Sequence, residues 1–146
     1  IFVPTGYVGR ENSWDIENNK PIHPIMDWEQ LRQLEGLGWE MAGHTRTHPH
    51  LDQLDDNTAL RDIVAGRDDL NSQMRGRTLT FCYPFGGMNS QTTNLVRRAG
   101  FMGACTTKSG VANLDHDHFR LPRVKVAYRD KRIGLLYRLL IRPKFK

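Results

Sequence analysis

The sequence predicts an α/β fold built on parallel strands, and two observations support this prediction. Short apolar runs alternate along the chain with amphipathic segments of helical period. Polar capping residues begin those amphipathic segments, and glycines follow several of them. A regular alternation of strand and helix is typical of βαβ units, in which neighbouring strands run parallel.

The expected strands share an apolar character and are bounded by glycine, proline or polar residues. They are residues 1–8, 39–43, 79–83, 101–107 and 119–127. The expected helices follow residues whose side chains can accept hydrogen bonds at a helix N-terminus. They begin at Asp27, with Gln30 completing a capping box, at one of Asp55, Asp56 and Asn57, and at Ser90. The expected loops and turns are residues 10–25, 44–54, 84–87 and 110–118.

The composition is that of a globular domain. A chain of 146 residues fits one domain with a buried core, and 38% hydrophobic with 25% charged residues argues against disorder. No apolar run approaches the roughly 18 residues of a membrane span. Because the chain opens on Ile1 rather than methionine, we expect part of the natural protein to precede it. A targeting signal therefore cannot be identified from this sequence.

The net charge of +5 is unevenly distributed. Residues 123–146 hold nine Lys or Arg and one Asp, a net +8, whereas the other 122 residues carry a net −3. Residues 128–146 can form a short amphipathic helix, with an apolar face made by Leu135, Leu136, Leu139 and Leu140. We expect this helix to pack on the domain, the alternative being a membrane interface or an anionic partner. Nucleic-acid binding is not expected, because no recognition module accompanies the charge.

Three of the six histidines, His44, His48 and His50, fall within seven residues, directly after an expected strand. The turn at residues 84–87 also follows a strand, so both motifs are expected at the carboxyl edge of the sheet. The four-residue spacing of His44 and His48 suits Zn²⁺ or a similar metal, although a catalytic zinc usually has three protein ligands. The alternative is a hydrogen-bonded histidine loop without metal. His50 is the weaker candidate, because Pro49 redirects the chain before it.

Two other groups of potential ligands are expected to be structural. The cluster Asp115–His118 precedes the last expected strand, at the opposite end of the fold, and is expected to be a solvated loop. Cys82 and Cys105 lie in apolar segments and are expected to be buried free thiols rather than a disulfide.

The histidine motif and the segments around it resemble the polysaccharide deacetylases, the NodB-homology domain of carbohydrate esterase family 4. His44-Thr-Arg-Thr-His48-Pro49 matches the family pattern His-(Ser/Thr)-x-x-His-(Pro/Ser) at each defined position. Other similar segments are residues 26–31, 38–44, 81–86, 95–101 and 121–124. The resemblance implies a distorted, incomplete (β/α) barrel that lacks its first strand. Residues 1–127 would form a partial catalytic domain, and residues 128–146 a basic amphipathic C-terminal segment.

The resemblance also implies a metal-dependent hydrolase that removes N-acetyl, sometimes O-acetyl, groups from glycans. His44 and His48 would hold a divalent metal, most often zinc, together with an aspartate, while a second aspartate acts as base. The metal and the Phe85 backbone N–H would stabilise the oxyanion. The substrate-binding residues of the turn would be Tyr83, Pro84 and Gly86. The implied partner is an acetylated amino-sugar polymer, and the implied location is extracellular, periplasmic or in the cell envelope.

Three features depart from the family pattern. No Thr-Phe-Asp-Asp motif is present, so the aspartate ligand and the base are expected upstream of Ile1, and the chain alone is expected to be nearly inactive. Cys82 and Phe85 stand where many members have arginine and tyrosine; Arg123 is a candidate for the missing guanidinium, the alternative being a surface ion pair. The late Leu-x-His motif is absent, which leaves the general acid unassigned. The competing hypothesis is a non-catalytic glycan- or surface-binding module on the same scaffold.

Overall fold

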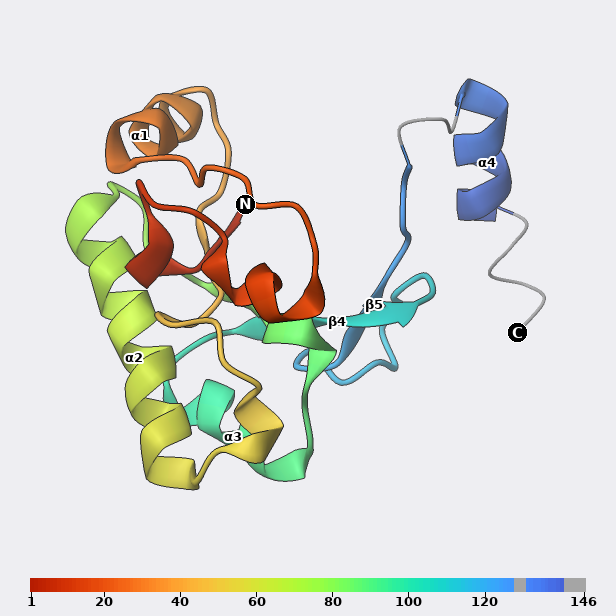
Figure 1. Cartoon of the computed structure of the whole chain (residues 1–146). Coiled ribbons are helices and arrows are strands. Elements are labelled where there is room, and N and C mark those ends of the chain that lie inside the picture. The colour runs from red at the N-terminus through yellow and green to blue at the C-terminus, as the bar shows by residue number, and fades with distance from the viewer. Residues whose placement is uncertain (128–130, 141–146) are drawn as a thin grey trace.

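A five-stranded parallel sheet forms the centre of the molecule (Figure 1). The structure is a computed structural model, and it describes residues 1–127 and 131–140. The strands follow one another in chain order: β1 (Phe2–Val3), β2 (Ala42–Gly43), β3 (Thr80–Cys82), β4 (Gly103–Ser109) and β5 (Leu121–Arg123). Parallel strands in sequential order are the arrangement of a (β/α) barrel, which confirms the predicted fold class.

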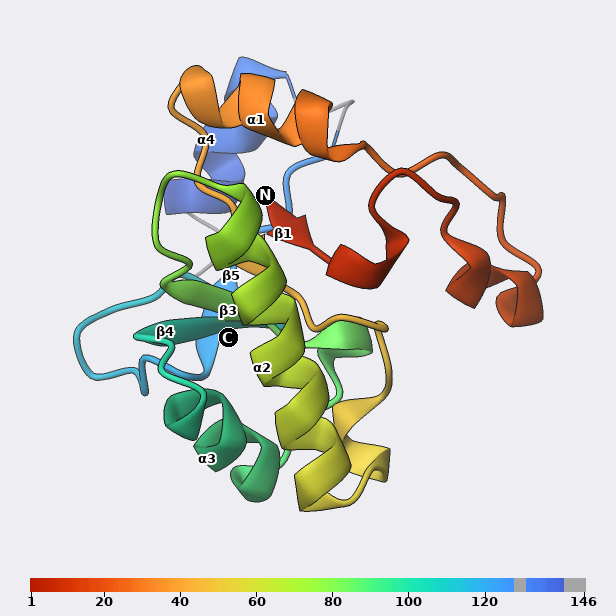
Figure 2. The ribbon, with the colours of Figure 1, turned by 90° about the vertical axis from the view of Figure 1, so that its left-hand side faces the viewer.

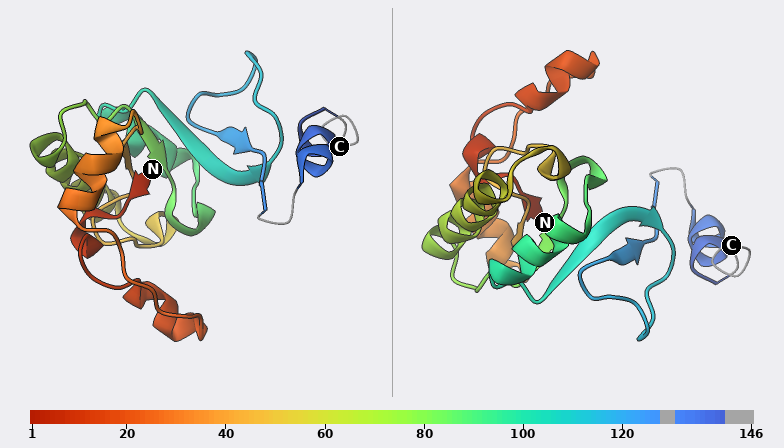
Figure 3. Two further views of the ribbon diagram at one scale, coloured as in Figure 1. Left: turned by 90° about the horizontal axis from the view of Figure 1, so that it is seen from above. Right: turned by 90° about the horizontal axis from the view of Figure 1, so that it is seen from below.

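Three helices connect the first four strands: α1 (Trp28–Gly36), α2 (Asp56–Gln73) and α3 (Ser90–Arg98). They lie together on one face of the sheet, as Figures 1 and 2 show from two directions. A fourth helix, α4 (Arg132–Leu140), lies beyond β5 and apart from the other three (Figures 1 and 3). Of the helices in the described ranges, none has the length and apolarity that crossing a bilayer requires.

The helix starts agree with the capping residues in the sequence. The Asp27 carboxylate accepts the Gln30 backbone N–H at 2.8 Å, and the Gln30 side chain accepts the Asp27 N–H at 3.0 Å, which completes the predicted capping box. Of the three candidates for the second cap, Asp55 takes the position. Asn89 caps α3, so Ser90 is its first residue, as predicted.

The strands are shorter than the sequence predicts, and their ends are shaped by proline. The first strand ends at Val3, because Pro4 has no N–H to donate and a 3-10 turn follows at Thr5–Tyr7. The last strand retains only Leu121–Arg123, at the sheet edge where its internal proline is tolerated. The predicted loop of residues 10–25 contains a 3-10 segment, Ser13–Asn18, whose tip extends away from the sheet (Figure 3).

Two apolar clusters hold the helices on the sheet. The larger lies between α2, α3 and the sheet, and its largest fully buried members are Tyr83, Phe81, Leu51, Ile63 and Val96. The smaller joins α1, β1 and the end of α2, through Val3, Leu31, Met41, Leu70 and Met74. Burying each such large apolar side chain stabilises the fold by roughly 1.5–3 kcal/mol.

The C-terminal helix does not pack as the sequence predicts. None of the described α4 side chains belongs to either apolar cluster, and Leu136 and Tyr137 are exposed. The predicted contributions of Leu139 and Leu140 lie outside the described side chains, as do residues 128–130 and 141–146 of the basic segment. The two cysteines follow their prediction in part: both are free and pair in register on β3 and β4, but only Cys82 is buried, because Cys105 lies half-buried on β4.

The backbone of helix α2 packs directly against the backbone of the loop that follows β2. A Cβ placed on Gly66 would lie 2.6 Å from the carbonyl carbon of Thr45 and 2.9 Å from the nitrogen of Arg46. Only a glycine permits this approach, and the loop therefore rests directly on the helix backbone.

We expect Gly66→Ala to lower the free energy of unfolding by about 1–3 kcal/mol, because the methyl group must push the helix and the loop apart. Denaturant unfolding followed by circular dichroism measures this change. Gly36→Ala is the matched control, since nothing lies within 4 Å of a Cβ at that helical position. Gly36→Ala should leave the free energy of unfolding unchanged or slightly raised. An equal decrease in both variants would show that the contact between Gly66 and the loop is not the cause.

Candidate functional site

His44 and His48 meet at the carboxyl edge of the sheet. His44 follows β2 directly, and its Nε2 lies 3.2 Å from Nε2 of His48, with the two rings edge to face at 71°. The His48 side chain is buried, and His44 is half-buried. The structure thus brings the two predicted histidines together, with their Nε2 atoms within hydrogen-bond distance of one another.

A strained backbone presents this pair. Thr45 and His48 have φ angles of +63° and +56°, a left-handed conformation that residues with a side chain rarely adopt. The Thr45 hydroxyl stabilises the turn by accepting the His48 backbone N–H at 3.0 Å. Such conformations persist only where the surroundings enforce them, and they cluster at functional sites.

Two carboxylates of α2 enforce the loop conformation. Asp62 accepts the backbone N–H groups of Arg46 and Thr47 at 3.0 and 3.2 Å, and the Thr47 hydroxyl at 2.9 Å. Asp69 pairs with the Arg46 guanidinium at 3.2 Å and accepts the Thr5 hydroxyl at 2.7 Å. Hydrogen bonds to a charged acceptor are among the stronger ones in proteins, so the loop is fixed before any ligand arrives.

The protonation pattern of the pair follows from its hydrogen bonds. His44 Nδ1 lies 2.6 Å from the Cys82 carbonyl oxygen, which can only accept, so Nδ1 carries the proton and Nε2 presents a lone pair. Nδ1 of His48 is buried without a hydrogen-bond partner among the described residues. Burial lowers the pKa of His44, helped by the charge of Arg123, and burial together with His44 lowers the pKa of His48 to about 4.

Neutral imidazoles with this separation fit two ligands of one metal ion. Zinc binds imidazole nitrogen at about 2.0–2.1 Å in tetrahedral geometry, which places two such nitrogens roughly 3.3 Å apart. The observed separation of the two Nε2 atoms is 3.2 Å. Within residues 1–127 and 131–140, no set of three His, Cys, Asp or Glu side chains could hold a metal, so the described donor set supplies two ligands.

The turn after β3 forms a second wall of the site. Phe85 also has a left-handed φ of +55°, and its ring lies edge to face on His48 with a centroid distance of 4.6 Å. The His50 ring stacks on the Phe85 ring, with a centroid distance of 4.0 Å and an angle of 11° between the ring planes. The backbone N–H of Phe85 donates to no acceptor among the described residues. His50 is therefore a support for Phe85, in keeping with its weaker candidacy as a ligand.

The other predicted residues of this turn, Tyr83, Pro84 and Gly86, make contacts within the fold. Tyr83 is 1% exposed and donates its hydroxyl to the Phe119 carbonyl at 2.9 Å, and Pro84 is buried. Gly86 has a φ of +75°, and a Cβ there would overlap the Thr107 side chain of β4. These contacts shape the turn through the core and through β4, and the expectation that the three residues bind substrate stays a prediction.

Arg123 lies at the end of β5 and close to the histidine pair. Its Nε donates to the Thr106 carbonyl at 3.0 Å, and its guanidinium carbon lies 5.9 Å from the centre of the Phe2 ring. The alternative of a surface ion pair is not seen among the described residues. Arg123 is thus placed where a positive charge acts on His44, and its role in orienting a base stays a prediction.

Trp14 is the site residue that the sequence pattern does not reveal. The Trp14 ring stacks on the His48 ring, with a centroid distance of 4.2 Å and an angle of 26° between the planes. The Tyr7 ring meets the Trp14 ring edge to face, with a centroid distance of 4.6 Å. The neighbouring Asp15 accepts the Asn12 side-chain amide at 2.8 Å, and its charge raises the pKa of His48 slightly against the effect of burial. The only signal in the sequence is a tryptophan in an otherwise polar segment.

The cluster Asp115–His118 forms no metal site within the described residues. His116 Nδ1 is held by the Asn113 side chain at 2.5 Å, and the Asp117 carboxylate accepts from Arg97 at 2.6 Å. These local contacts agree with the expected polar loop.

We expect the metal-free chain to lose stability as the pH is lowered from about 7 to 4. The unfolded histidines take up protons near pH 6.5, whereas His48 resists protonation until about pH 4, so stability is complete above the unfolded pKa and falls below it. The slope is at most about 1.4 kcal/mol per pH unit for each histidine.

Chemical denaturation at several pH values, with a chelator present, measures this slope. His48→Gln should flatten it, and the exposed His23→Gln is the matched control that should retain it. An unchanged slope in His48→Gln would show that the pair does not govern this pH dependence.

Comparisons with known proteins bear on this arrangement. The sequence model of the family described as polysaccharide deacetylase matches residues 1–104. The poly-beta-1,6-N-acetyl-D-glucosamine N-deacetylase of Staphylococcus aureus (strain MRSA252) is 20% identical over 135 residues, covering 86% of this chain and 44% of that protein. The chain spans less than half the length of the curated relatives that it matches.

Solved structures show the same fold. The deacetylase PplD of Streptococcus pyogenes, in complex with acetate, superposes with a TM-score of 0.74 at 22% identity, covering 84% of this chain and 53% of that one. IcaB from Ammonifex degensii superposes with a TM-score of 0.65 at 22% identity, covering 87% and 55%. At these identities the likeness supports the fold.

Proposed function

This chain belongs to the polysaccharide deacetylase family, and we propose that it is the histidine-bearing part of a metal-dependent hydrolase. The reaction is removal of N-acetyl groups, and by the same chemistry O-acetyl groups, from an acetylated amino-sugar polymer. One observation carries the proposal: two neutral imidazoles with Nε2 atoms 3.2 Å apart lie beside the strained turn at Phe85. The proposed location, as the family resemblance implies, is extracellular, periplasmic or in the envelope.

His44 and His48 are the residues that would hold the metal, and zinc suits their neutral imidazole nitrogens best. When bound, the ion polarises the acetyl carbonyl and lowers the pKa of a coordinated water. The Cys82 carbonyl fixes the orientation of His44, which is the usual task of a group behind a metal-binding histidine. No described residue is assigned as third ligand or base, and the family resemblance implies aspartates for both roles.

Phe85 is proposed to stabilise the reaction's oxyanion through its backbone N–H. Attack of water on the acetyl carbonyl places negative charge on the carbonyl oxygen, and a fixed donor stabilises that charge without reorganisation. The left-handed backbone of Phe85 and the contact between Gly86 and Thr107 hold this N–H in place. Arg123 is proposed to orient the base, because its guanidinium is anchored on Thr106 and acts on His44.

Aromatic rings on both sides of the histidine pair are proposed to contact the sugar. Trp14 stacks on His48, and Phe85 lies edge to face against the same ring. The C–H faces of a pyranose pack well on such apolar surfaces, so the two rings can hold one sugar unit over the site.

A non-catalytic glycan-binding module is the second candidate. It is favoured by the two-ligand donor set in the described part of the chain. In either case the chain by itself should release almost no acetate, because general-base catalysis and a full ligand set are both needed. The two candidates differ in what happens when an Asp-Asp segment is supplied.

We expect the chain to bind one Zn²⁺ or Co²⁺ per molecule and to lose this binding in His44→Ala and in His48→Ala. Each change removes one of two ligands, so affinity should fall at least tenfold. Isothermal titration and the visible absorption of bound Co²⁺ measure it without relying on activity. His50→Ala and His116→Ala are the matched controls, and binding that survives both site variants would refute the assignment.

Joining the chain to the family's Asp-Asp segment should give metal-dependent acetate release from an N-acetylglucosamine oligomer. His44→Ala and His48→Ala should each abolish release, because both ligands are needed to hold the ion. Arg123→Gln should lower kcat with little effect on KM if its task is to orient the base. Oligomer binding without any acetate release, in a folded and metal-loaded protein, would favour the binding module instead.

A further inference from the structure

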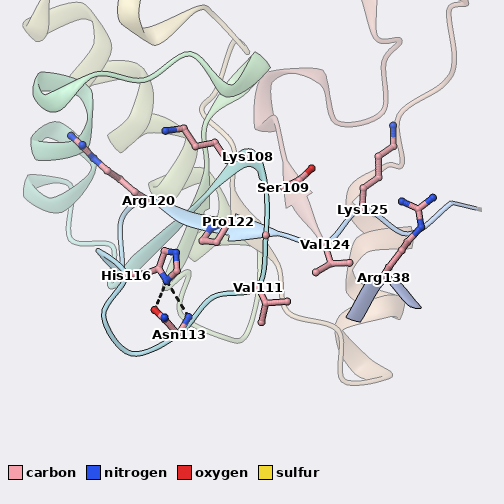
Figure 4. A pocket seen from close by; sticks show the side chains of 11 residues that line it. Lys108, Ser109, Val111, Asn113, His116, Arg120, Pro122, Val124, Lys125 and Arg138 are labelled. Atoms are coloured by element: carbon pink, nitrogen blue, oxygen red, sulfur yellow. Dashed lines mark hydrogen bonds between the residues drawn. The ribbon is translucent and has the colours of Figure 1, made fainter. Parts of the chain in front are cut away.

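A cavity of about 590 Å³ lies at the far end of the sheet, between β4, β5 and α4 (Figure 4). Its size is within the range that accommodates one small molecule or one lipid headgroup. Four basic side chains line it: Lys108, Arg120, Lys125 and Arg138. None of the lining residues, all within the described ranges, is an aspartate or a glutamate.

Asp115 and Asp117 lie in the segment that joins β4 to β5, but neither lines the cavity, and of the lining cations Arg120 is the one that pairs with Asp117. The Asp117 carboxylate is held by Arg97 at 2.6 Å and by the Phe119 backbone N–H at 3.0 Å, and it lies 3.8 Å from Nε of Arg120. Lys108 and Lys125 form no ion pair with any residue of the described ranges. The cavity therefore offers a net positive charge to an incoming group.

The surroundings of the cavity are apolar as well as basic. Val111, Pro122 and Val124 line it alongside the cations, and Figure 4 shows Val124 beside Lys125 and Arg138. Large apolar side chains are exposed on the same elements and on the segments that join them: Leu114 97%, Val126 58%, Leu136 55% and Tyr137 51%. A soluble anion would account for the cations alone, whereas an amphiphile with an anionic head accounts for both features.

We propose that this cavity binds the phosphate headgroup of an anionic membrane lipid, with the exposed apolar side chains entering the membrane interface. Basic residues beside an amphipathic helix are the general pattern of such binding. Helix α4 stands apart from the apolar core, which leaves Leu136 and Tyr137 available to the lipid. The proposal does not depend on the hydrolase assignment, because no histidine of the pair and no residue of the Phe85 turn lines the cavity.

Vesicle co-sedimentation of the full chain tests the proposal. Binding is expected to vesicles of phosphatidylglycerol in phosphatidylcholine, and not to phosphatidylcholine alone. Lys108→Ala with Lys125→Ala should weaken binding by about tenfold or more, since each cation near an anionic surface contributes roughly a factor of five. Arg77→Ala with Arg98→Ala removes the same charge from exposed positions elsewhere and is the matched control. Equal loss in both double variants would show unspecific charge attraction and overturn the site.

A second pair of measurements separates a lipid headgroup from free phosphate. Leu136→Ser keeps the charge but removes an exposed apolar contact, so it should weaken vesicle binding severalfold. Inorganic phosphate at millimolar concentration should compete poorly with vesicles. If phosphate displaces the protein completely and Leu136→Ser binds like the unaltered chain, the cavity is a site for a soluble anion and the lipid assignment is overturned. Equal binding to neutral and anionic vesicles would also overturn it.

Discussion

The histidine site depends on the contact between α2 and the loop that follows β2. The Asp62 carboxylate accepts three hydrogen bonds from that loop, and Gly66 lets the loop backbone rest on the helix. Left-handed φ angles at Thr45 and His48 carry about 1–3 kcal/mol of strain each. Charge-assisted bonds to a fixed carboxylate offset that strain, so the same helix that builds the core also aims the imidazoles.

Features that depend on neighbouring residues in the chain could be predicted from the sequence. The capping box of Asp27 and Gln30, the parallel strands and the meeting of His44 with His48 all arise from local spacing and from the rule that parallel strands end at one edge. Features that depend on tertiary packing could not. Trp14 reaches His48 from a segment that reads as a polar loop, and Tyr83 is buried by a hydrogen bond to Phe119, 36 residues later.

The edge strand β5 joins two chemically different regions. Arg123 is directed toward the histidine pair, while Val124 and Lys125, the next two residues, line the basic cavity. The first region is buried and keeps its imidazoles neutral, because burial penalises the charged form. The second is open to solvent and collects cations. The edge strand thus carries residues of the histidine site and of the basic cavity at adjacent positions.

The hydrogen bond between His44 and the Cys82 carbonyl bears on which side chains position 82 can hold. The group that orients this imidazole belongs to the main chain, which every residue type provides. The side chain at position 82 therefore takes no part in orienting His44, and it lies beside Cys105 between β3 and β4. A thiol can therefore occupy the place without disturbing the hydrogen bond that orients His44.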